Sequence, residues 1–334
     1  MIVRDREEFE AFGCDVNDDE IATPDKLPPN ISFVWEGPRE VDIRMPDGKE
    51  VTFWNFSDPR DSKSRDLWPS KTMRVKQGQV VHSTLDAKKN THTIHHHGMN
   101  SSTMNDGVGH VSFEVSDRYT YQFQPTHAGT YFYHCHKNTV LHFEMGMYGF
   151  LIVDPPSGRG TLYKDGPRYD VEALWALDDV DPSWRAIDHQ AGLCGEDAGL
   201  DLFRPKYFMI TGVPHPRTMT DKRAKITAKL GQTILIRHLN ASYSVVSTTI
   251  QGLDATVYGF DGRPLLHPSV PWAAPIFIPA GTPFETVSAQ RFDLILKPTR
   301  IGRYPVRIEF RHWVTGEIHD GGRGICETVI DVTE

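Results

Sequence analysis

The sequence predicts an all-β protein made of two β-sandwich domains. Short runs of alternating apolar and polar residues, each bounded by turn residues, recur from Ile31 onward, and such alternation is typical of antiparallel sandwiches. The 334 residues are enough for two domains of ordinary size. The 27 glycines and 23 prolines supply the many turns that short strands need.

The predicted elements fall into three segments along the chain. Residues 1–28 form an acidic arm with weak periodicity, residues 29–157 the first sandwich and residues 158–334 the second. The boundary lies at the breaker cluster Pro155–Gly160. The clearest strand-like runs of the first sandwich are 39–44, 50–54, 72–76, 79–82, 119–123 and 149–153. Those of the second are 169–175, 207–210, 233–237, 291–296 and 303–308.

Two short segments occur once in each predicted sandwich. Residues 75–79 (VKQGQ) correspond to 228–232 (AKLGQ), and residues 128–132 (AGTYF) correspond to 301–305 (IGRYP). We interpret these repeats as an internal duplication of one sandwich. Residues 178–205 are predicted to form a long irregular loop, and loops of this length are often functional.

Composition limits the possible partners and compartments. The net charge of −8 gives no attraction to nucleic acid or anionic membranes, and no apolar run reaches membrane-spanning length. The polar start, residues 1–8, has no signal-peptide core, so we expect a cytoplasmic protein or the mature form of an exported one. The four cysteines (Cys14, Cys135, Cys194 and Cys326) are too scattered for a disulfide framework.

Metal-binding residue types are concentrated in the first sandwich. Ten of the 16 histidines lie within residues 82–142, and neutral imidazole is the commonest metal ligand. His134-Cys135-His136 is followed by His142 and Met147. A thiolate, two imidazoles and a thioether are the ligands of a blue electron-transfer copper, whereas zinc favours paired cysteines or histidines with a carboxylate.

Strand geometry predicts two sites on opposite faces. Because side chains alternate along a strand, Cys135 and the upstream His92 share one face, over which His142 and Met147 fold from the following loop. Met145 competes with Met147 for the thioether role. The other face gathers four histidines: His95, His97, His134 and His136. The covalent path between the two sites is then only Cys135 and its neighbouring residue.

These segments resemble the cupredoxin domain of the laccase-like multicopper oxidases. The likeness covers residues 39–55 and 72–156 and is strongest at Met73–Gly78, Thr91–Met99, Asn105–Val108, Gly129–His136 and Gly146–Gly149. Residues 160–334 resemble the family's copper-free middle domain more distantly, through 208–212, 238–242, 261–264 and 290–294. The resemblance implies two cupredoxin-like Greek-key sandwiches and a copper cofactor.

The resemblance also implies a role for each residue. The type 1 copper would be held by His92, Cys135, His142 and Met147. A type 2 copper would take His95, and a type 3 pair would take His97, His134 and His136. Asp106 stands where the family has an acid that helps to deliver protons during oxygen reduction, although an Asp-Gly turn explains it equally well.

The second sandwich departs from the family pattern. A trinuclear cluster uses four His-X-His pairs, but residues 245–249 (VVSTT) and 310–313 (FRHW) stand where two of them belong. The spacing from Cys135 to His142 is closer to that of copper nitrite reductases. Those enzymes are trimers whose catalytic copper takes a third histidine from a neighbouring subunit. His312 falls near that position, with His319 and His267 as weaker candidates.

Three hypotheses follow. The first is a laccase-like copper oxidase that passes electrons from a small-molecule or metal-ion donor, through type 1 copper, to an oxygen-reducing copper site. The second is a nitrite-reductase-like enzyme with type 1 and mononuclear type 2 copper, although that family's aspartate is replaced at Thr93-Ile94. The third is a non-catalytic electron-transfer protein. A homotrimer is expected, because a symmetric neighbour can complete the copper ligands.

Overall fold

The computed structural model describes residues 27–108, 114–192, 197–265, 271 and 273–334. Most of the predicted arm (1–28) and the candidate His267 lie outside the described residues. Strands make up 46% of the structure and helices 9%, which confirms the all-β prediction. Among the described residues, no helix has the length and apolar character needed to cross a bilayer.

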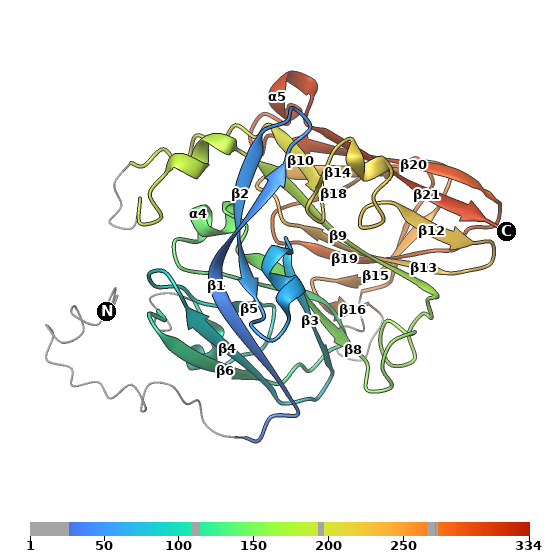
Figure 1. The fold of residues 1–334 in the computed structure, drawn as a ribbon. Coiled ribbons are helices and arrows are strands. Elements are labelled where there is room, and N and C mark those ends of the chain that lie inside the picture. Colours follow the sequence, from blue (N-terminus) through green and yellow to red (C-terminus); the bar gives the residue numbers. More distant parts are fainter. Residues whose placement is uncertain (1–26, 109–113, 193–196, 266–270, 272) are drawn as a thin grey trace, which may run out of the picture.

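The N-terminal sandwich consists of two four-stranded sheets (Figure 1). One sheet has the order β2 (Glu50–Ser57), β1 (Ile31–Arg44), β4 (Val81–Ala87) and β6 (Arg118–Phe123). The other has the order β3 (Ser70–Lys76), β8 (Tyr148–Asp154), β7 (Gly129–His134) and β5 (His95–His97). Alternate side chains of the two sheets, such as Trp35, Tyr121 and Leu151, fill the space between them.

The C-terminal sandwich also has two sheets. The first has the order β11 (Val213–Pro214), β10 (Tyr207–Ile210), β9 (Val171–Val180), β13 (Ile234–Asn240), β19 (Arg291–Leu296), β15 (Ala255–Phe260) and β16 (Arg263–Pro264), with β17 (Ile276–Ile278) paired to β15. The second has the order β12 (Ile226–Lys229), β21 (Ile325–Thr333), β20 (Gly302–Arg311), β14 (Val245–Ile250) and β18 (Phe284–Thr286). Short helices connect the strands: η1 (Ser62–Asp66), α3 (Thr103–Asp106), α4 (Thr139–Glu144), η2 (Pro182–Ala186), η3 (Arg217–Met219) and α5 (His319–Gly322).

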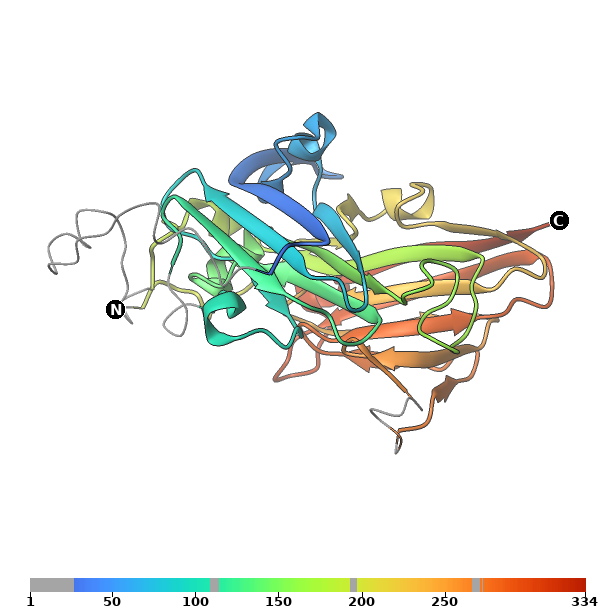
Figure 2. The same ribbon diagram turned by 90° about the horizontal axis from the view of Figure 1, so that it is seen from below.

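The two sandwiches lie side by side and share a buried interface (Figures 1 and 2). Every residue of β7, β8, β13 and β19 is buried, because these strands face a sandwich core on one side and the neighbouring sandwich on the other. Phe150 and Ile152 of β8 belong to one apolar cluster with Ala176 and Leu239 of the C-terminal sandwich. The strand that ends in His134 therefore has a rigid, fully packed support.

The repeats seen in the sequence have the same local structure. In one turn the backbone N–H of Lys76 donates to the side chain of Gln79 at 2.7 Å. In the other, the backbone N–H of Lys229 donates to the side chain of Gln232 at 2.8 Å. The glycine of each turn has a positive φ, 83° and 88°, which L-residues with a side chain rarely adopt. The hydroxyls of Tyr131 and Tyr304 each donate to the carbonyl four residues earlier. These matching details support an internal duplication.

A buried arginine joins the two sandwiches. The side chain of Arg237 in β13 is 0% exposed, with Nε 2.6 Å from Glu172 Oε1, and Nη1 3.0 Å from Thr130 Oγ1 and 3.4 Å from Asp293 Oδ1. Arg74 of the N-terminal sandwich donates to Glu172 at 2.7 Å. The interface thus holds a network of charges that must stay paired.

Arg237→Met is expected to lower the free energy of unfolding by about 3–5 kcal/mol, because it leaves the buried Asp293 without its arginine and Glu172 with one arginine fewer. Urea denaturation followed by tryptophan fluorescence measures the loss. Arg303→Met is the matched control, since Arg303 is 66% exposed in its ion pair with Asp331 and should cost less than about 1 kcal/mol. Equal losses in the two variants would contradict this account.

The same network predicts a pH dependence. Burial raises the pKa of Glu172, but the charges of Arg237 and Arg74 outweigh it and bring the pKa down to about 2. The folded-state pKa is therefore below the unfolded value, so the stabilisation is complete above pH 4.5 and is lost as pH falls toward 2. The stability difference between wild type and Glu172→Gln should be about 3 kcal/mol at pH 7 and should shrink below pH 4.5. A difference that is independent of pH would contradict the prediction.

Candidate metal centre

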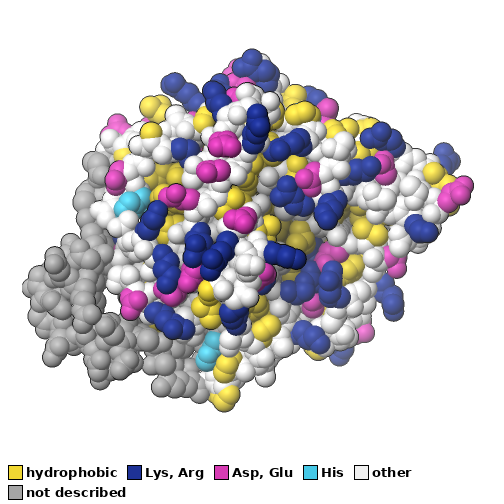
Figure 3. Space-filling model, viewed as in Figure 1, with side chains coloured by type: hydrophobic (Ala, Val, Ile, Leu, Met, Phe, Trp, Pro, Cys, Tyr) yellow, Lys and Arg dark blue, Asp and Glu magenta, His cyan; other side chains and the backbone are white. Residues whose placement is uncertain are grey.

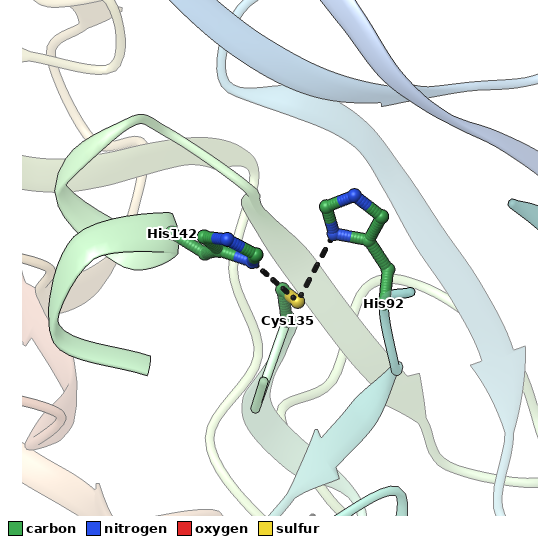
Figure 4. A group of neighbouring side chains, drawn as sticks. All are labelled: His92, Cys135 and His142. Carbon is green, nitrogen blue, oxygen red and sulfur yellow. Dashed lines mark hydrogen bonds between the residues drawn. The ribbon is translucent and has the colours of Figure 1, made fainter. Parts of the chain in front are cut away.

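Three predicted ligands meet on one face of the β7 segment. The sulfur of Cys135 lies 3.4 Å from Nδ1 of His142 and 3.6 Å from Nδ1 of His92 (Figure 4). All three side chains are buried. Cys135 directly follows β7, His142 lies in α4, and His92 precedes β5. Three elements thus bring one thiol and two imidazoles to a single point.

Backbone carbonyls orient both imidazoles toward the sulfur. Nε2–H of His92 donates to the carbonyl of Lys89 at 2.7 Å, and Nε2–H of His142 donates to the carbonyl of His189 at 3.2 Å. A carbonyl only accepts, so the hydrogen of each neutral ring is on Nε2 and the lone pair is on Nδ1. Both lone pairs then face Cys135, as a metal site requires.

The long segment between Cys135 and His142 is ordered by a short helix. The six-residue helix α4 begins after Asn138, whose φ of 41° turns the chain. The side-chain amide of Asn138 donates to the carbonyls of His189 and Ala191, both at 2.9 Å. The loop predicted over residues 178–205 is less irregular than expected, because β9 continues to Val180 and η2 occupies Pro182–Ala186. Its described part supplies the carbonyl that orients His142.

Met147 is better placed than Met145 for the thioether role. The backbone N–H of Cys135 donates to the carbonyl of Met147 at 3.0 Å, and both side chains belong to the same apolar cluster. The sulfur of Met145 instead lies 3.6 Å from Nη1 of Arg185, and its side chain belongs to a different cluster. The position of Met147 next to Cys135 supports the preference made from the sequence.

Burial keeps these groups uncharged in the absence of a metal. It raises the pKa of the Cys135 thiol to about 11 and lowers the pKa of His142 to about 3. Burial likewise holds the pKa of His92 well below its ordinary value, with a further contribution from His142. Neutral imidazoles are ready to coordinate, whereas the thiol needs a bound cation to lose its proton.

A second group of histidines lies on the opposite face. The ring centroid of His95 is 5.2 Å from those of His97 and His134 and 5.3 Å from that of His136. His97 Nδ1 is 3.3 Å from His134 Nε2. One possible ligand atom from each of His95, His97 and His134 lies within 4.8 Å of the other two. The structure thus brings together the four histidines predicted to share a face.

Two of these rings also have their tautomer fixed by carbonyls. Nδ1–H of His134 donates to the carbonyl of Cys135 at 2.8 Å, and Nδ1–H of His95 donates to the carbonyl of Asp106 at 2.6 Å. The lone pair of each neutral ring is therefore on Nε2, and Nε2 of His134 lies 3.3 Å from Nδ1 of His97. Burial lowers the pKa of both rings. Neutral rings that converge in a partly buried space can hold a metal cation.

Asp106 lies beside this second group. Its Oδ1 is 3.5 Å from His95 Nδ1, and its side chain is 29% exposed. The following residue, Gly107, has a φ of 70°, and a Cβ there would lie 2.0 Å from the carbonyl oxygen of Ile94. Only glycine permits this approach of the two segments. The Asp-Gly turn predicted at Asp106 and the contact of Asp106 with His95 are therefore both present in the structure.

Two further features near the sites had no signal in the sequence. Arg291 of the C-terminal sandwich is buried, with its guanidinium carbon 5.4 Å from the ring centroid of Phe132. The pKa of His97 is lowered to about 3, mainly by burial and next by the positive charge of Arg291. Lys137 and Glu114 form a buried ion pair beside Cys135. Both features depend on long-range packing, which residue spacing does not reveal.

His312 belongs to the C-terminal sandwich and is not part of either histidine group. It lines a pocket of about 390 Å³ formed by residues 201–206, His319 and Asp320. Its Nδ1 accepts the backbone N–H groups of Val314 and Thr315, at 3.1 and 3.3 Å. In a neutral ring the hydrogen is then on Nε2, so the ring would have to turn over or lose that hydrogen to bind a metal. Nε2 of His319 is buried without a hydrogen-bond partner.

Few histidines reach the molecular face shown in Figure 3, where basic and acidic side chains are interspersed. The Cys135 site is internal, since Cys135, His92 and His142 are each at most 1% exposed. In the second group His134 is buried, whereas the other three histidines are partly exposed. Bulk solvent is therefore largely excluded from the Cys135 site, which is shielded from screening by dissolved salt.

Comparison with known proteins shows what the segment that holds these sites is similar to. Residues 65–158 match the family model of the multicopper oxidases. An L-ascorbate oxidase from Cucumis sativus is 35% identical over 119 residues, which are 34% of this chain and 19% of that protein. A copper-containing nitrite reductase from Neisseria meningitidis is 28% identical over 128 residues, which are 38% of this chain and 31% of that protein.

Solved structures extend the similarity of fold to both sandwiches. The crystal structure of a blue copper oxidase from Nitrosomonas europaea has a TM-score of 0.69 and 23% identity, over 90% of this chain and 86% of that one. In contrast, the matched segments span less than a third of either curated relative. Copper is the metal of this family, and a type 1 site with further copper sites is general within it. Residues 65–158, which contain both histidine groups and Cys135, thus resemble a multicopper oxidase domain.

Proposed function

We propose that the protein is a copper-dependent oxidase in which Cys135 links an electron-accepting site to an oxygen-reducing site. The observation that carries this proposal is the pair of converging ligand groups on opposite faces of residues 134–136. Copper held by such groups supplies one-electron chemistry that connects a donor to oxygen. The proposed donor is a small molecule or a metal ion, and the proposed acceptor is molecular oxygen.

The residues of the chain have distinct roles in this scheme. His92, Cys135, His142 and Met147 would hold the type 1 copper, and His95, His97, His134 and His136 would hold the second site. Besides its peptide bond to Cys135, His134 donates a 2.8 Å hydrogen bond to the Cys135 carbonyl. The two sites are therefore joined by a short covalent path and a hydrogen bond, which favours transfer between them.

Asp106 is proposed to deliver protons at the second site, because it is half-buried and lies beside His95. Asp106→Asn keeps the backbone carbonyl that accepts from His95 but removes the acid, so it should slow oxygen reduction by about a hundredfold or more, the usual contribution of general acid catalysis. The blue absorption and the rate at which a donor reduces Cys135-bound copper should stay unchanged. Stopped-flow spectroscopy separates the two half-reactions. Equal slowing of both half-reactions would contradict the role.

We also propose a homotrimer in which a neighbouring subunit completes the second site. Each chain offers four histidines on that face, whereas an ordinary trinuclear cluster needs eight. His312 is the proposed contributor, and His319, with its unpartnered Nε2, is the alternative. Copper content of His312→Ala and His319→Ala, each measured with the mass of the assembly, tests this directly. If the protein is a monomer, or if both variants keep full copper, the neighbour's contribution is excluded.

Oxygen uptake during oxidation of a phenolic dye by the copper-loaded protein tests the proposed activity. Uptake that disappears in Cys135→Ser supports the oxidase. Nitrite reduction without oxygen uptake would favour the nitrite-reductase-like alternative. A blue protein that turns over neither oxygen nor nitrite would favour an electron carrier. The four-histidine face counts against a carrier, because a carrier needs no second site.

A further inference from the structure

A buried ion pair lies beside Cys135. Nζ of Lys137 is 2.8 Å from Oε2 of Glu114, and the two side chains are 1% and 6% exposed. The hydroxyl of Thr91 donates to Glu114 Oε2 at 2.9 Å and accepts from the ammonium of Lys137. The three side chains form a closed polar group that contains none of the proposed copper ligands.

This ion pair is in direct contact with the segments that carry the ligands. Lys137 follows Cys135 by two residues, and its carbonyl lies 3.7 Å from the cysteine sulfur. Thr91 precedes His92. Glu114 precedes Val115, whose backbone exchanges hydrogen bonds of 2.9 and 3.0 Å with His92. A charge in this position acts on the ligands through protein and not through bulk water.

The charges have unequal effects on the site. Burial is the largest influence on the pKa of Cys135, but among the charges Lys137 lowers that pKa more than Glu114 raises it. The same ammonium contributes to the lowered pKa values of His92 and His142, after burial. Lys137 lies two residues from Cys135 on the segment that contacts the sulfur, whereas Glu114 is linked to the ligands through Val115, so the ammonium is the charge more closely connected to the sulfur.

A buried ion pair is seldom kept for stability, since packed apolar residues would serve as well. Its effect on a neighbouring redox centre is larger, because charges interact strongly where water is excluded. We propose that Lys137, paired with Glu114, raises the reduction potential of the copper held by Cys135. This inference rests on the type 1 site of the proposed function.

The physical reason is the change of charge on reduction. The site gains one electron from the donor and so loses one unit of positive charge, while its ligands stay in place. A fixed positive charge nearby favours the less positive, reduced form. Removing the charge of Lys137 should therefore favour the oxidised form, and removing the charge of Glu114 should favour the reduced form. Opposite shifts are specific to a charge effect.

Anaerobic redox titration with one-electron mediators, followed by the blue absorption, tests the proposal. Lys137→Met should lower the equilibrium constant for reduction by at least about tenfold, which corresponds to 59 mV for one electron. Glu114→Gln should raise that constant. The double variant, which leaves no buried charge unpaired, should fall between wild type and Lys137→Met. The order of potentials is then E114Q, wild type, double variant and K137M, from highest to lowest.

Lys88→Met serves as the matched control, because Lys88 is 41% exposed in its ion pair with Asp86 and should leave the potential unchanged. Shifts of the same sign in E114Q and the double variant, or no shift in either, overturn the proposal. The double variant carries the test even if K137M or E114Q does not fold, since it leaves no buried charge unpaired. A potential of the double variant equal to or above that of wild type overturns the proposal. Absence of the blue absorption from wild type overturns the type 1 site itself and is recognised before any titration.

Discussion

Cys135→Ser should abolish the blue absorption of the copper-loaded protein and reduce electron transfer from any donor to background. Serine lacks the soft thiolate that type 1 copper requires, and its hydroxyl does not bridge the two sites. Cys135 is fully buried, so bulk water does not reach the position of its sulfur. Absorption spectroscopy, copper analysis and single-turnover reduction by ascorbate measure the loss.

Cys326→Ser is the control for that experiment. Cys326 is also buried, and it lies in the core of the C-terminal sandwich, where its sulfur contacts the hydroxyl of Thr218 at 3.8 Å. This substitution should leave the blue absorption intact. A Cys135→Ser protein that stayed blue, or a Cys326→Ser protein that lost its colour, would show that the wrong cysteine was assigned.

His97→Phe should impair the second copper site and leave the Cys135 site intact. Phenylalanine can keep the stacking of His97 on Phe132, whose ring centroid is 4.4 Å away, but it offers no lone pair. The blue absorption should remain, copper content should fall, and oxygen uptake should decrease by at least the 10–100-fold that is typical of losing an outer-shell group of a metal site. Donor reduction of the Cys135 site should keep its rate.

The neighbouring residue provides a matched control. His96 is buried on the other side of β5, 4.5 Å from the ring centroid of Phe123, and neither of its ring nitrogens has a hydrogen-bond partner. Because an unpartnered buried polar group destabilises the fold, His96→Phe should keep both copper sites and should not lower stability. Loss of oxygen uptake in His96→Phe, or its retention in His97→Phe, would show that the predicted strand register does not define the site.

Strand parity was enough to predict how the histidines are grouped. Alternation along β5 and residues 134–136 places His95, His97, His134 and His136 on one face, and the structure brings them together. His92 and His142 required more than parity, because one lies outside a strand and the other in α4. Ligand chemistry predicted their convergence on Cys135, and the fold provides it.

The groups that orient the ligands could not be predicted from the sequence. The carbonyls of Lys89 and His189 carry no side-chain signature, and their positions depend on turns and on the loop of residues 178–205. The pairing of Lys137 with Glu114 joins residues 23 positions apart through tertiary packing. Sequence motifs predict ligands well, whereas the groups that tune them depend on the complete fold.

Copper content per chain, determined together with the EPR spectrum, tests the central claim most directly. The claim is that two separate copper sites lie back to back on residues 134–136. It predicts at least two coppers per chain in wild type and a type 1 signal that disappears in Cys135→Ser while copper remains bound at the histidine face. A single copper per chain, or loss of all copper on removal of Cys135 alone, would contradict it.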